Sequence, residues 1–99
     1  MVINLFRLRI CDRFNAAHKL VGYNGKCEKL HGHTWTVEVF VTGNKLDDIG
    51  LLVDFGVLKK ELKKQIDRYD HSYLNDFKDI GNPTSENMSR FIFDNCALN

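Results

Sequence analysis

The sequence has little net charge, few cysteines and no long apolar run, and each shortage excludes a class of protein. Its 14 basic and 13 acidic side chains leave a formal net charge of +1, so there is no general electrostatic reason to bind nucleic acid or an anionic membrane. The three cysteines, Cys11, Cys27 and Cys96, are an odd number at irregular spacing, unlike the disulfide framework of a small secreted domain. We therefore expect reduced thiols and a cytoplasmic location.

The N-terminal segment and the overall composition predict one small folded domain. Arg7, Arg9 and Asp12 interrupt the apolar residues at the start of the chain, which has neither a signal-peptide core nor a membrane span. Apolar residues make up 43% of the chain and charged residues 27%, a balance unlike that of a disordered segment. We expect the 99 residues to form a single domain over residues 1–99, with one layer of sheet and one of helix.

Hydrophobic periodicity predicts two strands followed by two helices. Apolar side chains occupy every second position in residues 3–12 and again in 31–42, as in half-buried strands. Residues 55–69 carry apolar side chains at helical spacing, with lysines on the other face, and residues 82–85 form a helix-start signal. Two strands alone leave their edges unpaired, so we expect further strands to be missing or supplied by a partner.

Three of the four histidines are grouped in a pattern typical of a metal site. His31 and His33 are two residues apart on a predicted strand, so their side chains point to the same face, and Gly32 between them leaves room for another group. A third imidazole from His18 would complete three nitrogen ligands around Zn²⁺, with the fourth position open for water or substrate. The alternative is a chance His-X-His pattern of ordinary hydrogen-bonded histidines.

Two further groups could take part in the chemistry of such a site. Cys27 lies four residues before His31 and is either a fourth zinc ligand, which would close the site, or a thiolate beside the metal. Asp70 and His71 follow the first predicted helix, where a carboxylate next to an imidazole suits acid/base work; the alternative is a helix cap. We interpret Cys11 and Cys96 as buried apolar groups.

Six segments, in order along nearly the whole chain, resemble the 6-pyruvoyltetrahydropterin synthase family, which includes the bacterial 6-carboxytetrahydropterin synthases. They are residues 14–18, 27–33, 52–55, 58–59, 70–75 and 82–87. The combination of Cys-X₃-His-Gly-His with an upstream Ala-Ala-His and a downstream Asp-His is more specific than any one part. The short spacing between Cys27 and His31 is similar to the 6-carboxy branch, which serves queuosine synthesis.

The resemblance implies an α+β tunnelling fold (T-fold), with an antiparallel sheet and two helices on one face. Subunits of such proteins join their sheets into a barrel, and the implied assembly is a homohexamer of two trimers. The resemblance also implies roles for particular residues: zinc ligands His18, His31 and His33; proton acceptor Cys27; acid/base partners Asp70 and His71; and pterin-binding residues Thr84 and Ser85.

The implied activity is zinc-dependent conversion of 7,8-dihydroneopterin triphosphate to 6-carboxy-5,6,7,8-tetrahydropterin, with release of acetaldehyde and triphosphate. The alternatives are a 6-pyruvoyltetrahydropterin synthase, a non-catalytic zinc or pterin-binding module, and a cysteine hydrolase that uses Cys27 with His71. Family members continue past the second helix into two more strands and a glutamate that grips the pterin. That strand pair is absent here, so we expect the chain to be C-terminally incomplete; Glu86, on the second predicted helix, is not that glutamate.

Overall fold

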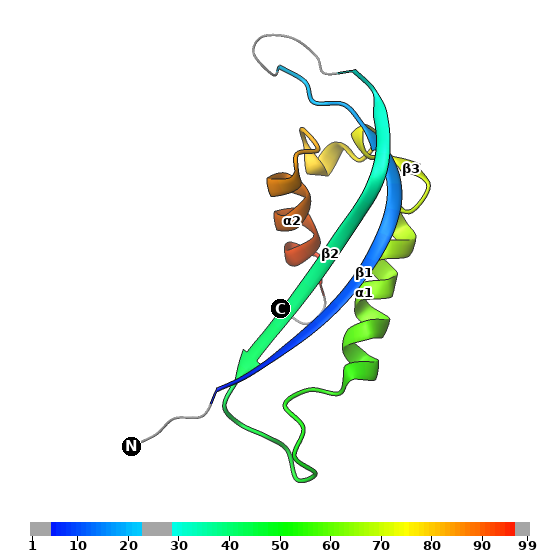
Figure 1. Ribbon diagram of the computed structural model, residues 1–99. Coiled ribbons are helices and arrows are strands. Elements are labelled where there is room, and N and C mark those ends of the chain that lie inside the picture. Colours follow the sequence, from blue (N-terminus) through cyan, green and yellow to red (C-terminus); the bar gives the residue numbers. More distant parts are fainter. Residues whose placement is uncertain (1–4, 23–28, 97–99) are drawn as a thin grey trace.

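A long pair of antiparallel strands forms most of the sheet. The computed structural model describes residues 5–22 and 29–96. Strands β1 (Phe6–His18) and β2 (His31–Gly43) each have 13 residues and run side by side (Figure 1). They pair along their whole length, so that His18 lies directly opposite His31. A two-residue strand, β3 (Ser72–Tyr73), adds to the other edge of β1 in the parallel direction and gives the sheet order β2-β1-β3.

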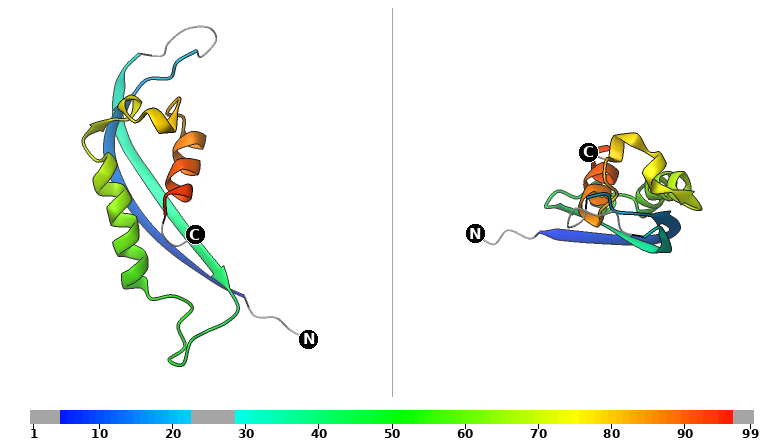
Figure 2. Two further views of the ribbon diagram at one scale, coloured as in Figure 1. Left: turned by 180° about the vertical axis from the view of Figure 1, so that it is seen from behind. Right: turned by 90° about the horizontal axis from the view of Figure 1, so that it is seen from above.

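Two helices cover one face of this sheet. They are α1 (Phe55–Tyr69) and α2 (Ser85–Asp94), and two short 3₁₀ turns, Leu74–Asp76 and Lys78–Ile80, lie between them along the chain (Figure 2). Both helices begin at capping side chains, since Asp54 accepts the backbone N–H of Gly56 and Thr84 accepts that of Asn87. Within the described segments, neither helix has the length and apolar character needed to cross a bilayer.

The core lies between the sheet and the helices and is rich in aromatic rings. Tyr69 at the end of α1 is fully buried and contacts the rings of Phe14, Phe77 and Phe91. Phe14 in turn stacks on its cross-strand neighbour Trp35, with ring centroids 5.9 Å apart and planes within 1° of parallel. Burial raises the pKa of the Tyr69 phenol, because a low-dielectric environment disfavours the phenolate.

The structure confirms the helices and extends the first strand. The predicted helix over residues 55–69 coincides with α1, and the helix-start signal precedes α2. The first strand was predicted over residues 3–12, of which 3 and 4 lie outside the described residues; it continues to His18 because β2 pairs with it that far. The short parallel strand β3 was not predicted, because two residues carry no periodicity.

The prediction that Cys11 is a buried apolar group is wrong. Its side chain is exposed, because the core-facing positions of β1 are the alternate ones that include Ile10 and Phe14. Cys96, just after α2, is half-buried. The lysines of α1 line its solvent face, as predicted from their spacing.

Leu58→Ala should destabilise the protein by about 2–5 kcal/mol, because the Leu58 side chain is 1% exposed and its truncation leaves a cavity between α1 and the sheet. The measurement is urea unfolding followed by circular dichroism. Val57→Ala, at a neighbouring position of the same helix that is 51% exposed, is the matched control and should change the free energy of unfolding by about 0.5 kcal/mol or less. Equal losses in the two variants would contradict this packing of α1.

Candidate metal centre

Three imidazoles converge at the end of the strand pair. The Nε2 atom of His18 lies 3.1 Å from Nε2 of His31 and 3.2 Å from Nε2 of His33. The antiparallel register explains the convergence: His18 is directly opposite His31, and His33 is two residues farther along β2 on the same face. The potential ligand atoms of all three lie within 4.8 Å of one another. The sequence-predicted histidines are therefore brought together at one point.

Backbone carbonyls determine which nitrogen of each ring is available as a ligand. Nδ1 of His18 lies 2.8 Å from the carbonyl oxygen of Pro83, Nδ1 of His31 lies 2.9 Å from that of Lys29, and Nδ1 of His33 lies 3.1 Å from that of Thr34. A carbonyl oxygen can only accept, so in each ring Nδ1 carries the hydrogen and donates it. In the neutral rings the lone pair is then on Nε2, the atom that faces the other two histidines.

The arrangement of these lone pairs fits a bound cation. Two unprotonated nitrogens at 3.1 Å repel each other unless a positive charge lies between them. Nitrogen ligands at the usual zinc distance of about 2.0–2.1 Å in a tetrahedron are roughly 3.3 Å apart, close to the 3.1 and 3.2 Å between the Nε2 atoms here. Three neutral imidazoles also leave one position of a tetrahedron for another ligand. The three histidines are thus positioned to bind a metal ion.

The site is buried on one side and open on the other. His18 is only 6% exposed, whereas His31 and His33 are exposed. Trp35 contacts two of the rings: it stacks on His33 at a centroid distance of 4.3 Å and meets His18 edge-on at 4.8 Å. Trp35 itself is anchored in the core by Phe14. Trp35 therefore supports His18 and His33 from the core, and the exposed His31 and His33 leave the site open to solvent on the side of β2.

Asp70 and His71 lie beside the same strand pair but outside the histidine cluster. Asp70 accepts the backbone N–H of Asn15 at 2.9 Å, and its other carboxylate oxygen lies 2.9 Å from Nδ1 of His71. Asn15 is three positions before His18 on β1. The backbone N–H of Asp70 also donates to the carbonyl of Ile66, so Asp70 caps α1 and holds the imidazole at the same time. Both sequence interpretations of this pair, cap and acid/base group, fit the geometry.

The backbone of His71 has an uncommon conformation. Its φ of 59° is the one positive value among the non-glycine residues that the structure describes, and this left-handed region costs an L-residue roughly 1–2 kcal/mol. The backbone N–H of His71 donates to the carbonyl of Asn15, which holds the turn in place. The imidazole is 80% exposed. A strained backbone that presents an exposed titratable side chain is typical of functional sites.

The remaining predicted site residues lie in different places. Thr84 is half-buried and its hydroxyl caps α2 by accepting the backbone N–H of Asn87 at 3.0 Å. Ser85 is exposed and lines a small pocket of about 150 Å³ that shares Trp35 with the histidine site. Cys27 lies outside the described residues.

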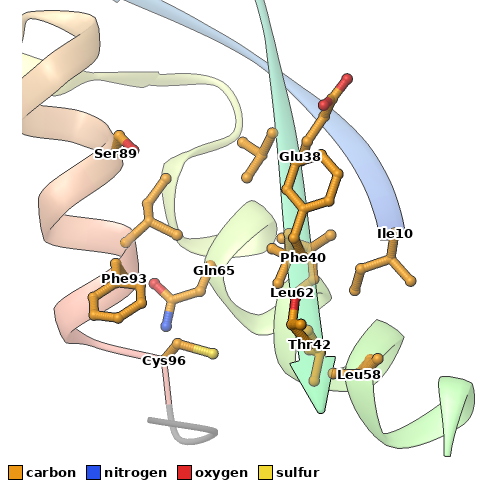
Figure 3. A pocket seen from close by; sticks show the side chains of 14 residues that line it. Ile10, Glu38, Phe40, Thr42, Leu58, Leu62, Gln65, Ser89, Phe93 and Cys96 are labelled. Carbon is orange, nitrogen blue, oxygen red and sulfur yellow. The ribbon is translucent and has the colours of Figure 1, made fainter. Parts of the chain in front are cut away.

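A larger cavity of about 480 Å³ lies elsewhere, between β2 and the two helices (Figure 3). Its walls are mainly apolar and include Ile10 of β1, Leu58 and Leu62 of α1, and Phe93 of α2. None of the three clustered histidines lines it. The candidate site is therefore identified by the convergence of the three imidazoles and not by the size of a cavity.

Some residues of the site could not have been assigned from the sequence. Pro83 acts through its carbonyl oxygen, which no side-chain pattern indicates, and Asn15 matters through its backbone N–H. Trp35 is one of the alternating apolar residues of the predicted strand over 31–42 and has no role assigned from the sequence, yet it contacts His18 and His33. The alternation that places Trp35 on the same strand face as His33 was the available signal.

An α+β domain with three histidines clustered at the end of a strand pair defines the class: a domain whose three imidazoles are positioned to bind a metal ion. The family model described as 6-pyruvoyl tetrahydropterin synthase matches residues 7–99. The 6-carboxy-5,6,7,8-tetrahydropterin synthase of Bacillus subtilis is 44% identical over 97 residues, covering 91% of this chain and 64% of the relative. The protein of the same name from Rickettsia felis is 36% identical over 98 residues, covering 80% and 71%.

A solved structure agrees with these sequence matches. The Caenorhabditis elegans 6-pyruvoyl tetrahydropterin synthase superposes with a TM-score of 0.76 at 26% identity, covering 93% of this chain and 76% of that one. The chain therefore belongs to the 6-pyruvoyl tetrahydropterin synthase family and has its T-fold. It spans about two thirds of the length of the Bacillus subtilis relative.

The contact between Asp70 and Asn15 should make the stability of the protein depend on pH. Accepting the Asn15 N–H, with help from the His71 ring, lowers the pKa of Asp70 from its ordinary value of 3.8. Because the folded-state pKa is the lower one, the stabilisation is present above pH 3.8 and is lost as the pH falls through the folded-state value. Wild type should therefore unfold at a higher temperature than Asp70→Asn near neutral pH, and the difference in unfolding temperature should shrink as the pH falls below 3.8.

The control for this measurement is Asp67→Asn. Its carboxylate pairs with Lys63 on the exposed side of α1, an interaction that contributes about 0.5 kcal/mol or less. The measurement is thermal unfolding at a series of pH values. If the unfolding temperature of Asp70→Asn stayed as close to that of wild type as the unfolding temperature of Asp67→Asn does at every pH, the role of Asp70 would be contradicted.

Proposed function

We propose that this chain is part of a zinc-dependent lyase that converts 7,8-dihydroneopterin triphosphate to 6-carboxy-5,6,7,8-tetrahydropterin, releasing acetaldehyde and triphosphate. One observation carries the proposal: the Nε2 atoms of His18, His31 and His33 converge. In each of these rings the other nitrogen, Nδ1, donates to a backbone carbonyl. The names of the curated relatives at 36–44% identity support the 6-carboxy product. That product would serve queuosine synthesis in the cytoplasm.

Zinc fits the site because three neutral imidazoles with one position open are a common ligand set of catalytic zinc, whereas hard cations such as Mg²⁺ and Ca²⁺ prefer oxygen ligands. His18, His31 and His33 would hold it. The ion would supply Lewis-acid stabilisation of negative charge on oxygens of the substrate side chain. The buried His18 and its Trp35 base limit water on one side, whereas the exposed His31 and His33 leave room for a pterin side chain on the other.

Three residues are proposed to move protons. Cys27, as a thiolate, would remove a proton from the substrate side chain, and the Asp70–His71 pair would return or relay one. Asp70 orients the His71 ring through Nδ1, so the opposite nitrogen, Nε2, is the one that would exchange a proton with substrate. Thr84 and Ser85 are proposed to help hold the pterin. Because the hydroxyl of Thr84 already caps α2, we expect its contribution to come from its backbone.

The assembly is proposed to be a homohexamer. In the described residues, β2 is the outer strand of the sheet order β2-β1-β3 and has no neighbour on its second edge. A strand edge without a neighbouring strand is a ready template for pairing with another chain. Joined sheets of the T-fold would close this edge into a barrel.

Incubation with zinc and 7,8-dihydroneopterin triphosphate tests the reaction. The expected products are 6-carboxy-5,6,7,8-tetrahydropterin, identified by mass, and acetaldehyde in equal amount. A 6-pyruvoyl product without acetaldehyde would instead assign the alternative activity, which the name of the Caenorhabditis elegans structure favours.

Two substitutions separate the catalytic proposal from a non-catalytic zinc module. His31→Ala should lose the metal, because it removes a ligand, whereas Cys27→Ala should retain one zinc per chain and lose turnover by about 10²–10⁴-fold. The measurements are metal content after gel filtration and product formation. Loss of zinc from Cys27→Ala would show that Cys27 closes the coordination sphere and would overturn its role as a base.

His71→Gly distinguishes the acid/base role of His71 from a purely structural one. Glycine adopts positive φ without steric cost, so the free energy of unfolding should stay within about 1 kcal/mol of wild type. Turnover should nevertheless fall by about 100-fold or more. Unchanged turnover in a normally folded variant would reduce the pair to a helix cap.

A further inference from the structure

Two asparagine side chains continue the pairing of β1 beyond its last residue. The amide of Asn75 accepts the backbone N–H of Lys19 at 3.0 Å and donates to its carbonyl at 2.9 Å. The amide of Asn82 does the same with Val21, at 2.8 and 3.0 Å. Each side chain thus makes the two hydrogen bonds that a residue of a neighbouring strand would make. We call Asn75 and Asn82 the asparagine clamp.

The asparagine clamp acts on the edge of β1 that faces away from β2. Strand β3 pairs with Ala16 and Ala17 along that edge, where the backbone groups of Asn15 also bond to Asp70 and His71. The clamp takes over at Lys19 and Val21, which lie an even number of residues beyond Asn15 and so present their backbone groups to the same edge. On the opposite edge, β2 pairs with β1 as far as His18. The chain around His18 is therefore held from both sides.

Asn82 also connects this segment to the group that orients His18. Its neighbour Pro83 provides the carbonyl that accepts the Nδ1 hydrogen of His18. The carbonyl of Asn82 itself accepts the side-chain N–H of Asn87 at 2.8 Å and the backbone N–H of Thr84, which ties it to the first turn of α2. The side chain of Asn82 thus sets the position of the His18-bearing strand relative to the Pro83 carbonyl.

We infer that the asparagine clamp positions His18 for metal binding. The inference rests on the proposed function only in requiring that the three histidines bind a metal. Asn75 and Asn82 touch neither metal nor substrate in this role; they keep Nε2 of His18 aimed at the other two imidazoles. Asparagine suits the task because its amide carries a donor and an acceptor in one plane, whereas aspartate only accepts and would repel the carbonyl of Val21.

The test compares zinc affinity across variants of the full chain by competition with a chelator of known affinity. Asn82→Asp and Asn75→Ala should bind zinc about 10–100-fold more weakly than wild type, as expected when a group that orients a ligand is lost. Asn95→Ala is the matched control, since the Asn95 amide also donates to a backbone carbonyl, that of Phe91, but at the far end of α2. It should bind zinc as wild type does.

Amide hydrogen exchange in the zinc-free protein gives a second measurement that needs no metal. The N–H groups of Lys19 and Val21 should be protected in wild type, and Asn75→Ala should lose the protection of Lys19. Asn82→Asp retains the acceptor for Val21, so weakened zinc binding with Val21 still protected would separate positioning from unfolding.

Each other result has a distinct meaning. Wild-type protein that binds no zinc would overturn the proposed function and this inference together. Zinc binding by wild type, with Asn82→Asp and Asn75→Ala equal to it, would overturn the inference alone. An equal loss in Asn95→Ala would also overturn it, because affinity would then follow general stability. Rapid exchange of Lys19 and Val21 in wild type would show that the clamp does not hold the chain.

Discussion

The register between β1 and β2 is the constraint on which the rest of this structure depends. Pairing His18 with His31 places both side chains on one face, and the two-residue repeat of a strand adds His33 beside them. A slip of one residue would send His18 to the opposite face and disperse the cluster. The same register stacks Phe14 on Trp35, so the interaction that builds the core also brings the three histidines together.

The helices secure this register and supply what the strands lack. Tyr69 of α1 packs against Phe14, and the segment before α2 gives His18 its Pro83 carbonyl. The turn after α1 reaches β1 at Asn15 through Asp70 and His71. Helix ends therefore meet the sheet at the histidine end, whereas the apolar cavity between β2 and α2 lies away from it.

Much of the fold could be predicted because its elements are local in origin. Leu58, Leu62 and Ile66 recur at helical spacing and face the core, and Thr84 caps α2 where the helix-start signal stands. The end of β1 could not be predicted, since Asp12 interrupts the alternation between the core residues Ile10 and Phe14, and the strand continues past Asp12 because β2 pairs with it there. The same limit applies to β3, whose two residues are defined solely by pairing with Ala16 and Ala17.

The sequence by itself determined which side chains can bind a metal. The His-Gly-His spacing puts two imidazoles on one strand face, and His18 provides the third. Only the tertiary structure decided which nitrogen of each ring is available, because that depends on carbonyls such as those of Pro83 and Thr34. It also decided that Asn75 and Asn82 serve as substitutes for a strand. Hydrogen bonds between distant segments produce no periodic pattern in the sequence, so they can be identified only from the folded structure.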